Sequence, residues 1–248
     1  MSRPIVLVHG AWGGAHGFRK VRPILTRSGL DVFTPSLTGI GERSHLTHPG
    51  VSLSTHVTDV VNTVLYEDLD DIVLLGFSYG GMVVTGALDH IGDRVSALVY
   101  LDAFVPADGQ SLLAIVGGLL ANAPATSGPI AIGDDWLVPP IPRELDDPVE
   151  TAWSNERRSM QPVKTFSEAV RLSKPQEAWP FSLTYVKATA DANESPDSAF
   201  WQAARHAEAS DRWAYHEIAT NHLIPTTHPD DLAAILSPLA LGEQSGED

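Results

Sequence analysis

The stretch Leu74–Gly86, LLGFSYGGMVVTG, places one serine among small residues directly after an apolar run. Ser78 has Gly76 two positions before it, and Gly80 and Gly81 follow it closely. A serine in a tight turn between a strand and a helix needs such neighbours, because only minimal side chains fit around that turn. The motif therefore predicts a strand–turn–helix element that exposes the Ser78 hydroxyl.

Short apolar runs along the rest of the chain predict an α/β fold. These runs read as strands, and several are apolar on both faces, as expected for buried parallel strands. Helical patterns separate them, including a helix around Val57–Leu65 with Ser54 as its N-cap and a closing helix after His228. Strands that alternate with helices predict a mainly parallel sheet of about six strands, with helices on both faces. The predicted strands are Ile5–Gly10, Asp31–Leu37, Asp71–Phe77, Ala97–Ala103, Ser182–Thr189 and Trp213–Ala219.

The regular pattern stops between residues 106 and 180, where Pro and Gly are frequent. A structureless loop of that length is unusual in a compact domain. We therefore predict an inserted helical cap at 106–180, with helices at Gln110–Leu120 and Val149–Ser159. The core then consists of residues 1–105 and 181–248.

Composition restricts the classes of partner. The chain has 248 residues, a formal net charge of −15 and no cysteine. An acidic protein is a poor match for nucleic acid or an anionic membrane, and the missing cysteines suit a reducing cytoplasm. No segment approaches about 18 uninterrupted apolar residues. We expect a soluble cytoplasmic protein with a small-molecule substrate, and a homodimer is compatible with the sequence.

A serine hydroxyl needs a base to act as a nucleophile, and His222 is the best placed of the ten histidines. It follows the last strand and precedes the last helix, so it lies at the same carboxyl edge of the sheet as Ser78. His228 begins the closing helix and is predicted to be a surface or capping residue. His45 and His48 have no carboxylate-rich stretch beside them, so no metal site is predicted.

Two aspartates are candidates for the acid that orients the base. Asp102 ends the apolar strand ALVYLDA, where an ionised carboxylate is costly unless it is paired. Asp191 follows the penultimate strand in a polar loop. Both alternatives stay open, with Asp102 favoured.

The segment after the first strand, HGAWGG at 9–14, is suited to stabilise an oxyanion. We expect the backbone N–H groups of Ala11 and Tyr79 to form the oxyanion hole, and His9 to tie the loop down without a catalytic role.

Aromatic side chains near these motifs predict a hydrophobic or aromatic substrate. For the tryptophans of the insertion, among them Trp179, filling the cap's own small core is the alternative. The residues predicted to contact substrate are Trp12, Phe77, Phe104, Trp136 and Trp153.

Four segments together resemble the α/β-hydrolase superfamily: VLVHGAWGGAHGF, GFSYGG, VYLDAFVP and NHLIPTTHPDDL. The branch they resemble holds small plant methylesterases, hydroxynitrile lyases and their bacterial esterase relatives. The resemblance implies a helical cap, a site without cofactor, Ser78 as nucleophile and His222 as base. Asp191 matches the acid of the plant members, whereas bacterial relatives that share YLDAFVP often lack an acid there.

The leading hypothesis is a serine hydrolase that cleaves a small carboxylic ester or lactone through an acyl-enzyme on Ser78. One alternative is non-hydrolytic use of the same site by a lyase, a decarboxylating enzyme or a cyclising enzyme. Lys187 lies within a strand and is a poor match for the lysine of hydroxynitrile lyases. The other alternative is a hydrolase-fold protein that only binds its ligand.

Overall fold

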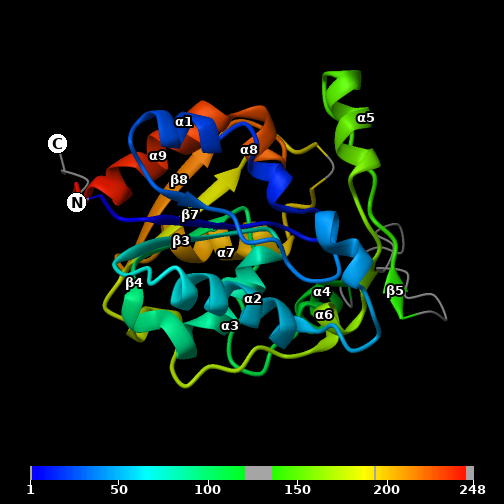
Figure 1. Cartoon of the computed structure of the whole chain (residues 1–248), viewed down its shortest axis with the longest axis horizontal. Helices are drawn as coiled ribbons and strands as arrows, with labels where there is room; N and C mark the ends of the chain where they lie inside the picture. The colour runs from blue at the N-terminus through cyan, green and yellow to red at the C-terminus, as the bar shows by residue number, and fades with distance from the viewer. Residues whose placement is uncertain (1, 121–135, 193, 244–248) are drawn as a thin grey trace.

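A six-stranded parallel sheet forms the centre of the computed structural model, which describes residues 2–120, 136–192 and 194–243. The strand order is β2-β1-β3-β4-β7-β8, and every pairing is parallel (Figure 1). All six predicted strands are present, but their bounds differ from the prediction: the second has two residues where seven were predicted, the fourth lies two residues earlier at both ends, and the other four are one or two residues shorter. The six strands are β1 (Ile5–Val8), β2 (Val32–Phe33), β3 (Ile72–Phe77), β4 (Val95–Leu101), β7 (Ser182–Ala188) and β8 (Trp213–Ile218).

Helices cover both faces of this sheet. In Figure 1, α1 and α9 lie above the sheet, and α2 and α3 lie below it. The α-helices of the core are α1 (Arg22–Arg27), α2 (Leu53–Tyr66), α3 (Gly80–Ile91), α7 (Ala199–Glu208), α8 (Ile224–Thr227) and α9 (Pro229–Leu241). Short 3-10 turns are η1 (Ala15–Phe18), η2 (Gly41–Leu46), η3 (Gly92–Arg94) and η4 (Gln176–Ala178).

The strands carry apolar residues at successive positions because they separate two hydrophobic cores. Ile5 and Leu7 of β1 point into the core beneath α1 and α9, whereas Val6 and Val8 point into the core beneath α2 and α3. The same alternation continues along β3 and β4. A sheet covered on both faces requires this pattern.

Helix α2 begins with a different cap from the one predicted. Ser52 is the N-cap, and its backbone N–H donates to Thr55 Oγ1 at 3.2 Å. Ser54 lies in the first turn, where its N–H and hydroxyl donate to the Glu168 carboxylate at 2.8 and 2.6 Å. The prediction of Ser54 as the N-cap was wrong. Ser52 and Ser54 both suit a helix start by residue type, and the bonds of Ser54 to Glu168, which is distant in sequence, could not be foreseen.

Between β4 and β7 the chain forms the insertion. It contains α4 (Leu112–Leu120), β5 (Leu137–Val138), α5 (Pro148–Glu156), β6 (Gln161–Pro162) and α6 (Lys164–Ser167). Both predicted helices are present. The antiparallel pair β5–β6 was not predicted, since two residues a strand are too few to show a period. Residues 121–135 of the predicted cap lie outside the described residues.

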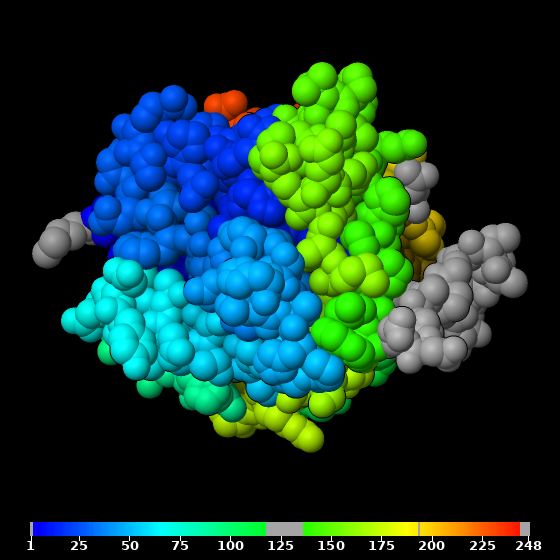
Figure 2. Space-filling model, turned by 45° about the vertical axis from the view of Figure 1, so that its right-hand side comes forward, coloured from blue at the N-terminus to red at the C-terminus, as the bar shows by residue number. Residues whose placement is uncertain are grey.

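Trp12, in the loop after β1, anchors the insertion to the core. Its N–H donates to Gln161 Oε1 at 2.7 Å, its indole N–H donates to the Val138 carbonyl at 3.1 Å, and its own carbonyl accepts from the Ser159 N–H at 2.9 Å. Figure 2 shows the insertion in green seated against the blue N-terminal segment. The loop predicted to stabilise an oxyanion is thus fixed by the insertion.

The turn from β3 into α3 is packed against two neighbouring backbones. A Cβ added to Gly80 would lie 2.5 Å from the Val8 carbonyl oxygen, and one added to Gly81 would lie 2.1 Å from the Phe104 carbonyl oxygen. Ser78 has a φ of 56°, in the left-handed region that side chains rarely adopt. The glycines around Ser78 therefore make room for a strained residue, as the sequence predicted.

We expect Gly81→Ala to lower the free energy of unfolding by about 2–3 kcal/mol, because the backbone of Phe104 cannot yield to the added methyl group. Gly117→Ala in α4 is the matched control. Among the described residues, no atom outside the backbone of its own helix and its chain neighbours lies within 4 Å of a Cβ there, so the substitution should stabilise by up to about 1 kcal/mol. Urea unfolding of both variants measures the difference. Equal stabilities would contradict the tight packing of the turn.

Candidate active site

Ser78 and His222 meet at the carboxyl edge of the sheet. Ser78 follows β3, and His222 lies on the loop between β8 and α8. The Nε2 atom of His222 is 3.0 Å from the Ser78 hydroxyl oxygen. This distance lets the hydroxyl donate its proton to the imidazole, which is the geometry that a nucleophile and its base require.

Asp102 completes a line of hydrogen bonds with these two residues. It follows β4 with a φ of 40°, its side chain is fully buried, and its Oδ2 lies 2.6 Å from His222 Nδ1. Burial acts to raise the pKa of the Asp102 carboxyl, but the hydrogen bonds and positive charges of His222 and Lys187 outweigh it and lower the pKa. The carboxyl is thereby kept ionised beside the imidazole.

Asp191, the other candidate acid, contacts a different part of the same histidine. Its Oδ2 accepts from the backbone N–H of His222 at 3.4 Å. The structure therefore brings both aspartates to His222, one at the imidazole and the other at the main chain.

Lys187 is a member of the site that we did not predict. Its ammonium group is fully buried and donates at 2.7 Å to Asp102 Oδ1, to Glu194 Oε2 and to the carbonyl of Ala188. A lysine inside the otherwise apolar strand SLTYVKAT was the available signal, since a buried ammonium requires anionic partners.

The predicted oxyanion donors lie on either side of Ser78. Tyr79 directly follows the serine at the start of α3, and a Cβ on Gly10 would lie 3.0 Å from Ser78 Cβ, so the loop that carries Ala11 passes close to the nucleophile. Within the described ranges, the backbone N–H groups of Ala11 and Tyr79 donate to no protein acceptor. Both are therefore available to a bound oxygen.

Two buried neutral histidines support these donors. His9 Nε2 accepts from the N–H of Leu37 at 3.1 Å, as expected for a residue that ties the loop down. His56 Nδ1 accepts from the hydroxyl of Tyr79 at 2.9 Å and its Nε2–H donates to the Thr38 carbonyl at 2.8 Å. Burial lowers the pKa of His9 to about 4 and that of His56 to about 3.

Phenyl rings surround the imidazole of His222. The ring of Phe77 lies 4.9 Å from it between centroids, and Phe200 stacks on it at 5.0 Å with an interplanar angle of 13°. Phe104 contacts Phe200 at 4.8 Å. Phe200 was missed because it lies in the first turn of α7, a helix that the sequence analysis did not identify.

The tryptophans make contacts within the protein. The indole of Trp12 is buried and bonded to the insertion, and the ring of Trp153 lies 4.0 Å from the Arg19 guanidinium and 4.3 Å from that of Arg157. Trp179 is buried and stacks with Phe181. Trp136 precedes β5, and its carbonyl accepts from Val163. The contacts of Trp12, Trp153 and Trp179 are those of packing residues.

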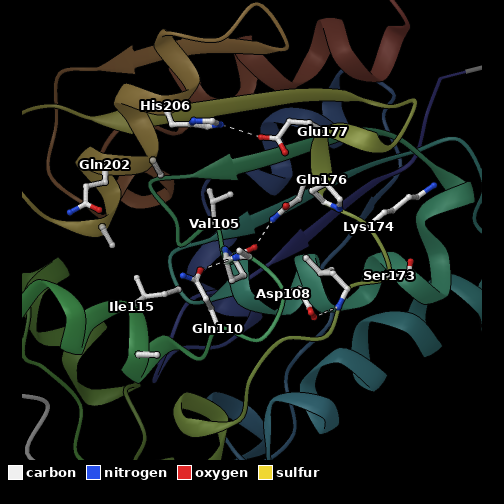
Figure 3. A pocket seen from close by; sticks show the side chains of 17 residues that line it. Val105, Asp108, Gln110, Ile115, Ser173, Lys174, Gln176, Glu177, Gln202 and His206 are labelled. Carbon is white, nitrogen blue, oxygen red and sulfur yellow. Dashed lines mark hydrogen bonds and ion pairs between the residues drawn. The ribbon is translucent and has the colours of Figure 1, made fainter.

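A cavity of about 580 Å³ adjoins the base and the acid. Its lining residues are Asp102, Pro142, Arg143, Glu144, Ala190, Asp191, Ala192, Glu194, Phe200, Asn221, His222 and Leu223. A larger hollow of about 850 Å³ lies between α4, α7 and the segment 172–177, and Figure 3 shows His206 paired with Glu177 at its rim. Neither Ser78 nor His222 lines this hollow, whereas His222 and Asp102, though not Ser78, line the smaller cavity.

The profile described as "Alpha/beta hydrolase family" matches residues 5–235. The chain belongs to this family. A carbendazim hydrolyzing esterase from Nocardioides sp. (strain SG-4G) is 42% identical over 176 residues, which are 68% of this chain and 73% of the relative. Methylesterase 8 of Arabidopsis thaliana is 32% identical over 116 residues, which are 43% of this chain and 39% of the plant protein.

Among solved structures, an extracellular α/β-hydrolase from a Paenibacillus species has a TM-score of 0.76 and covers 96% of this chain and 99% of its own. At 20% identity this likeness shows the fold alone. A bacterial esterase and a plant methylesterase are the kinds of relative that the motifs resemble, so the predicted family is confirmed. The relatives support carboxylic ester hydrolysis by this chain and do not favour the alternative activities.

Two features are absent from the described residues. No helix there has the length and apolar character needed to cross a membrane. No group of three or more His, Asp or Glu side chains there could hold a metal ion.

The buried histidines predict an acid-sensitive fold. Below pH 6.5 the unfolded chain takes up protons at His9 and His56 that the folded chain does not bind. Stability is therefore complete above that pH and falls as the pH drops toward 4, by up to about 1.4 kcal/mol per pH unit for each histidine. Urea unfolding between pH 7.5 and 4.5 measures this slope. His56→Gln should show a shallower slope, and an unchanged slope would contradict a neutral buried His56.

Proposed function

We propose that this chain hydrolyses a small carboxylic ester with Ser78 as nucleophile, His222 as general base and Asp102 as the orienting acid. The observation that carries the proposal is the continuous line of hydrogen bonds from the Ser78 hydroxyl through both imidazole nitrogens to the Asp102 carboxylate. Hydrolases with a serine nucleophile use this order of groups.

The reaction proceeds in two halves. Ser78 Oγ attacks the ester carbonyl carbon while its proton passes to His222 Nε2, and Asp102 stabilises the resulting imidazolium. The N–H groups of Ala11 and Tyr79 bind the developing oxyanion. The tetrahedral intermediate expels the alcohol, which takes the proton from His222. Water then attacks the acyl-enzyme carbonyl while His222 takes its proton. The second tetrahedral intermediate breaks its bond to Ser78 Oγ, which takes the proton back from His222, and the carboxylic acid leaves.

Asp102 is the proposed acid because its carboxylate contacts the imidazole. In this role it holds the Nδ1–H tautomer, so that Nε2 is free to accept the proton of Ser78. Asp191, on the main chain of His222, helps to place the loop.

The proposed substrate has a hydrophobic or aromatic part. The cluster of Phe77, Phe104 and Phe200 beside His222 offers an apolar surface next to the reacting atoms. The insertion at 106–180 acts as the cap over this site, an inference supported by its attachment to the loop of Trp12. We place the protein in the cytoplasm because it has no cysteine.

Lyase chemistry of the hydroxynitrile lyase type has less support. It would use a lysine that reaches the substrate, but the ammonium of Lys187 is buried and all three of its donors are engaged. The alternative of a protein that only binds its ligand would leave the contact between Ser78 and His222 without a purpose.

We expect Ser78→Ala, His222→Ala and Asp102→Asn each to lower kcat for 4-nitrophenyl acetate by roughly 10⁴-fold or more. Intact-mass analysis after fluorophosphonate treatment should show one adduct on the wild type and none on the Ser78 and His222 variants. Asp191→Asn is the matched control and should retain activity to within about tenfold. If Asp191→Asn abolishes activity and Asp102→Asn does not, the assignment of the acid is wrong.

A second expectation concerns the acyl group. With 4-nitrophenol as the common leaving group, butyrate and benzoate esters should exceed the hydroxyacetate ester in kcat/KM by roughly tenfold or more, since each apolar group buried in a pocket contributes at about this level. Initial rates across the panel test this directly. Faster turnover of the polar acyl group would refute a hydrophobic acyl site.

A further inference from the structure

Lys187 stands at the centre of a buried ionic chain. Its Nζ lies 2.7 Å from a carboxylate oxygen of Asp102 and 2.7 Å from one of Glu194. The Ala188 carbonyl accepts the third hydrogen bond of the ammonium group. The Trp201 ring adds a further contact, with its centroid 4.7 Å from Nζ. An ammonium with no exposure is stable only when partners of this kind replace its lost hydration.

The chain continues from Glu194 to the helix that faces the base. The other carboxylate oxygen of Glu194 accepts a hydrogen bond from the Ser198 hydroxyl. Ser198 is the N-cap of α7, and its Oγ accepts from the Trp201 N–H at 3.1 Å. Phe200, in the first turn of this helix, stacks on the imidazole of His222. One set of contacts therefore joins the acid to the element that covers the base.

We propose that Lys187 and Glu194 form a positioning pair for the catalytic acid: Lys187 fixes Asp102 Oδ1 so that Oδ2 meets His222, and Glu194 offsets the ammonium charge. The proposal rests on the function inferred above, in which Asp102 is the acid. Neither residue touches the reacting atoms, so both act through Asp102.

The balance of charges explains why two residues are needed. Lys187 alone would neutralise the Asp102 carboxylate and weaken its stabilisation of the imidazolium. With Glu194 present, the three groups carry a net negative charge beside His222. The charged groups bonded to Asp102 are His222 and Lys187, and Lys187 in turn contacts Glu194. Arg143, Glu144 and Asp191 line the same cavity, and the charge of Asp102 acts on Tyr185 and Tyr215. Of these, Glu194 is the anion that contacts the ammonium.

The first test is Glu194→Gln, which keeps the shape of the side chain and removes its charge. The imidazolium then loses part of its electrostatic stabilisation, so the acid limb of the pH profile of kcat/KM should move to lower pH by roughly 0.5–1 pH unit. Asp197→Asn is the matched control, since it removes one negative charge from an exposed position in the same loop. A shift in both variants, or in neither, would overturn the proposal.

The second test is a double-mutant cycle. Lys187→Met leaves the buried Asp102 and the partly buried Glu194 as two like charges without a cation between them, and kcat/KM should fall by about 100-fold or more. Adding Glu194→Gln removes one of these charges and should restore at least about tenfold. If Lys187 only filled space, the two losses would multiply, and that result would reject the positioning role. Should Lys187→Met fail to fold, the pH profile of Glu194→Gln decides alone.

A readout without turnover separates this proposal from the proposed function. The proton between His222 Nδ1 and Asp102 should give a low-field ¹H NMR signal in the free protein. Its pH dependence should shift in Glu194→Gln and not in Asp197→Asn. If the wild type hydrolyses no ester but the signal behaves in this way, the proposed function fails and the positioning pair stands. If the wild type hydrolyses esters but the signal does not shift in Glu194→Gln, the proposed function stands and the positioning pair fails.

Discussion

The structure depends on keeping one carboxylate ionised in a place that water does not reach. The Asp102 side chain has no exposure, and an unpaired carboxylate there would cost far more than the fold could tolerate. Both of its oxygens are therefore engaged, one by Lys187 and the other by His222. Since these partners come from β7 and from the loop after β8, the acid–base pair can assemble only when the outer half of the sheet is in place.

On the other side of Ser78 the site is held by neutral groups. His9 fixes the loop after β1, and His56 receives the hydroxyl of Tyr79, whose backbone N–H is a proposed oxyanion donor. Burial lowers the pKa of both histidines far below neutrality, so they act as hydrogen-bonding groups without charge. A neutral ring at each position accepts the hydrogen bond that holds the donors in place, whereas a protonated ring has no acceptor nitrogen and would lose that bond.

Features of the site with a signal in the nearby sequence could be predicted, whereas contacts between residues far apart in the chain could not. Ser78 and His222 were predictable because each has a local signal: the glycines of the turn, and a loop between the last strand and helix. Parallel strands then place both at one edge. The choice between Asp102 and Asp191 could not be made locally, because both lie near His222 and only the side-chain direction separates them. The contacts of Trp12 with Gln161 and of Trp153 with Arg19 could not be read locally either, since the partners lie more than a hundred residues apart in the sequence.

Lys187 illustrates how a residue that breaks a local pattern can be read. A lysine in an apolar, buried strand needs an anionic partner for its ammonium group. Lys187 lies on β7, the strand next to β4, which Asp102 follows, so Asp102 is a candidate for that partner. The register aligns Leu101 with Val186, so the residues that follow these two positions, Asp102 and Lys187, lie side by side at the edge of the sheet. A strand pairing inferred from topology alone would thus have brought the two charges together. The general lesson is that buried charges should be matched across neighbouring strands before a catalytic role is assigned to either.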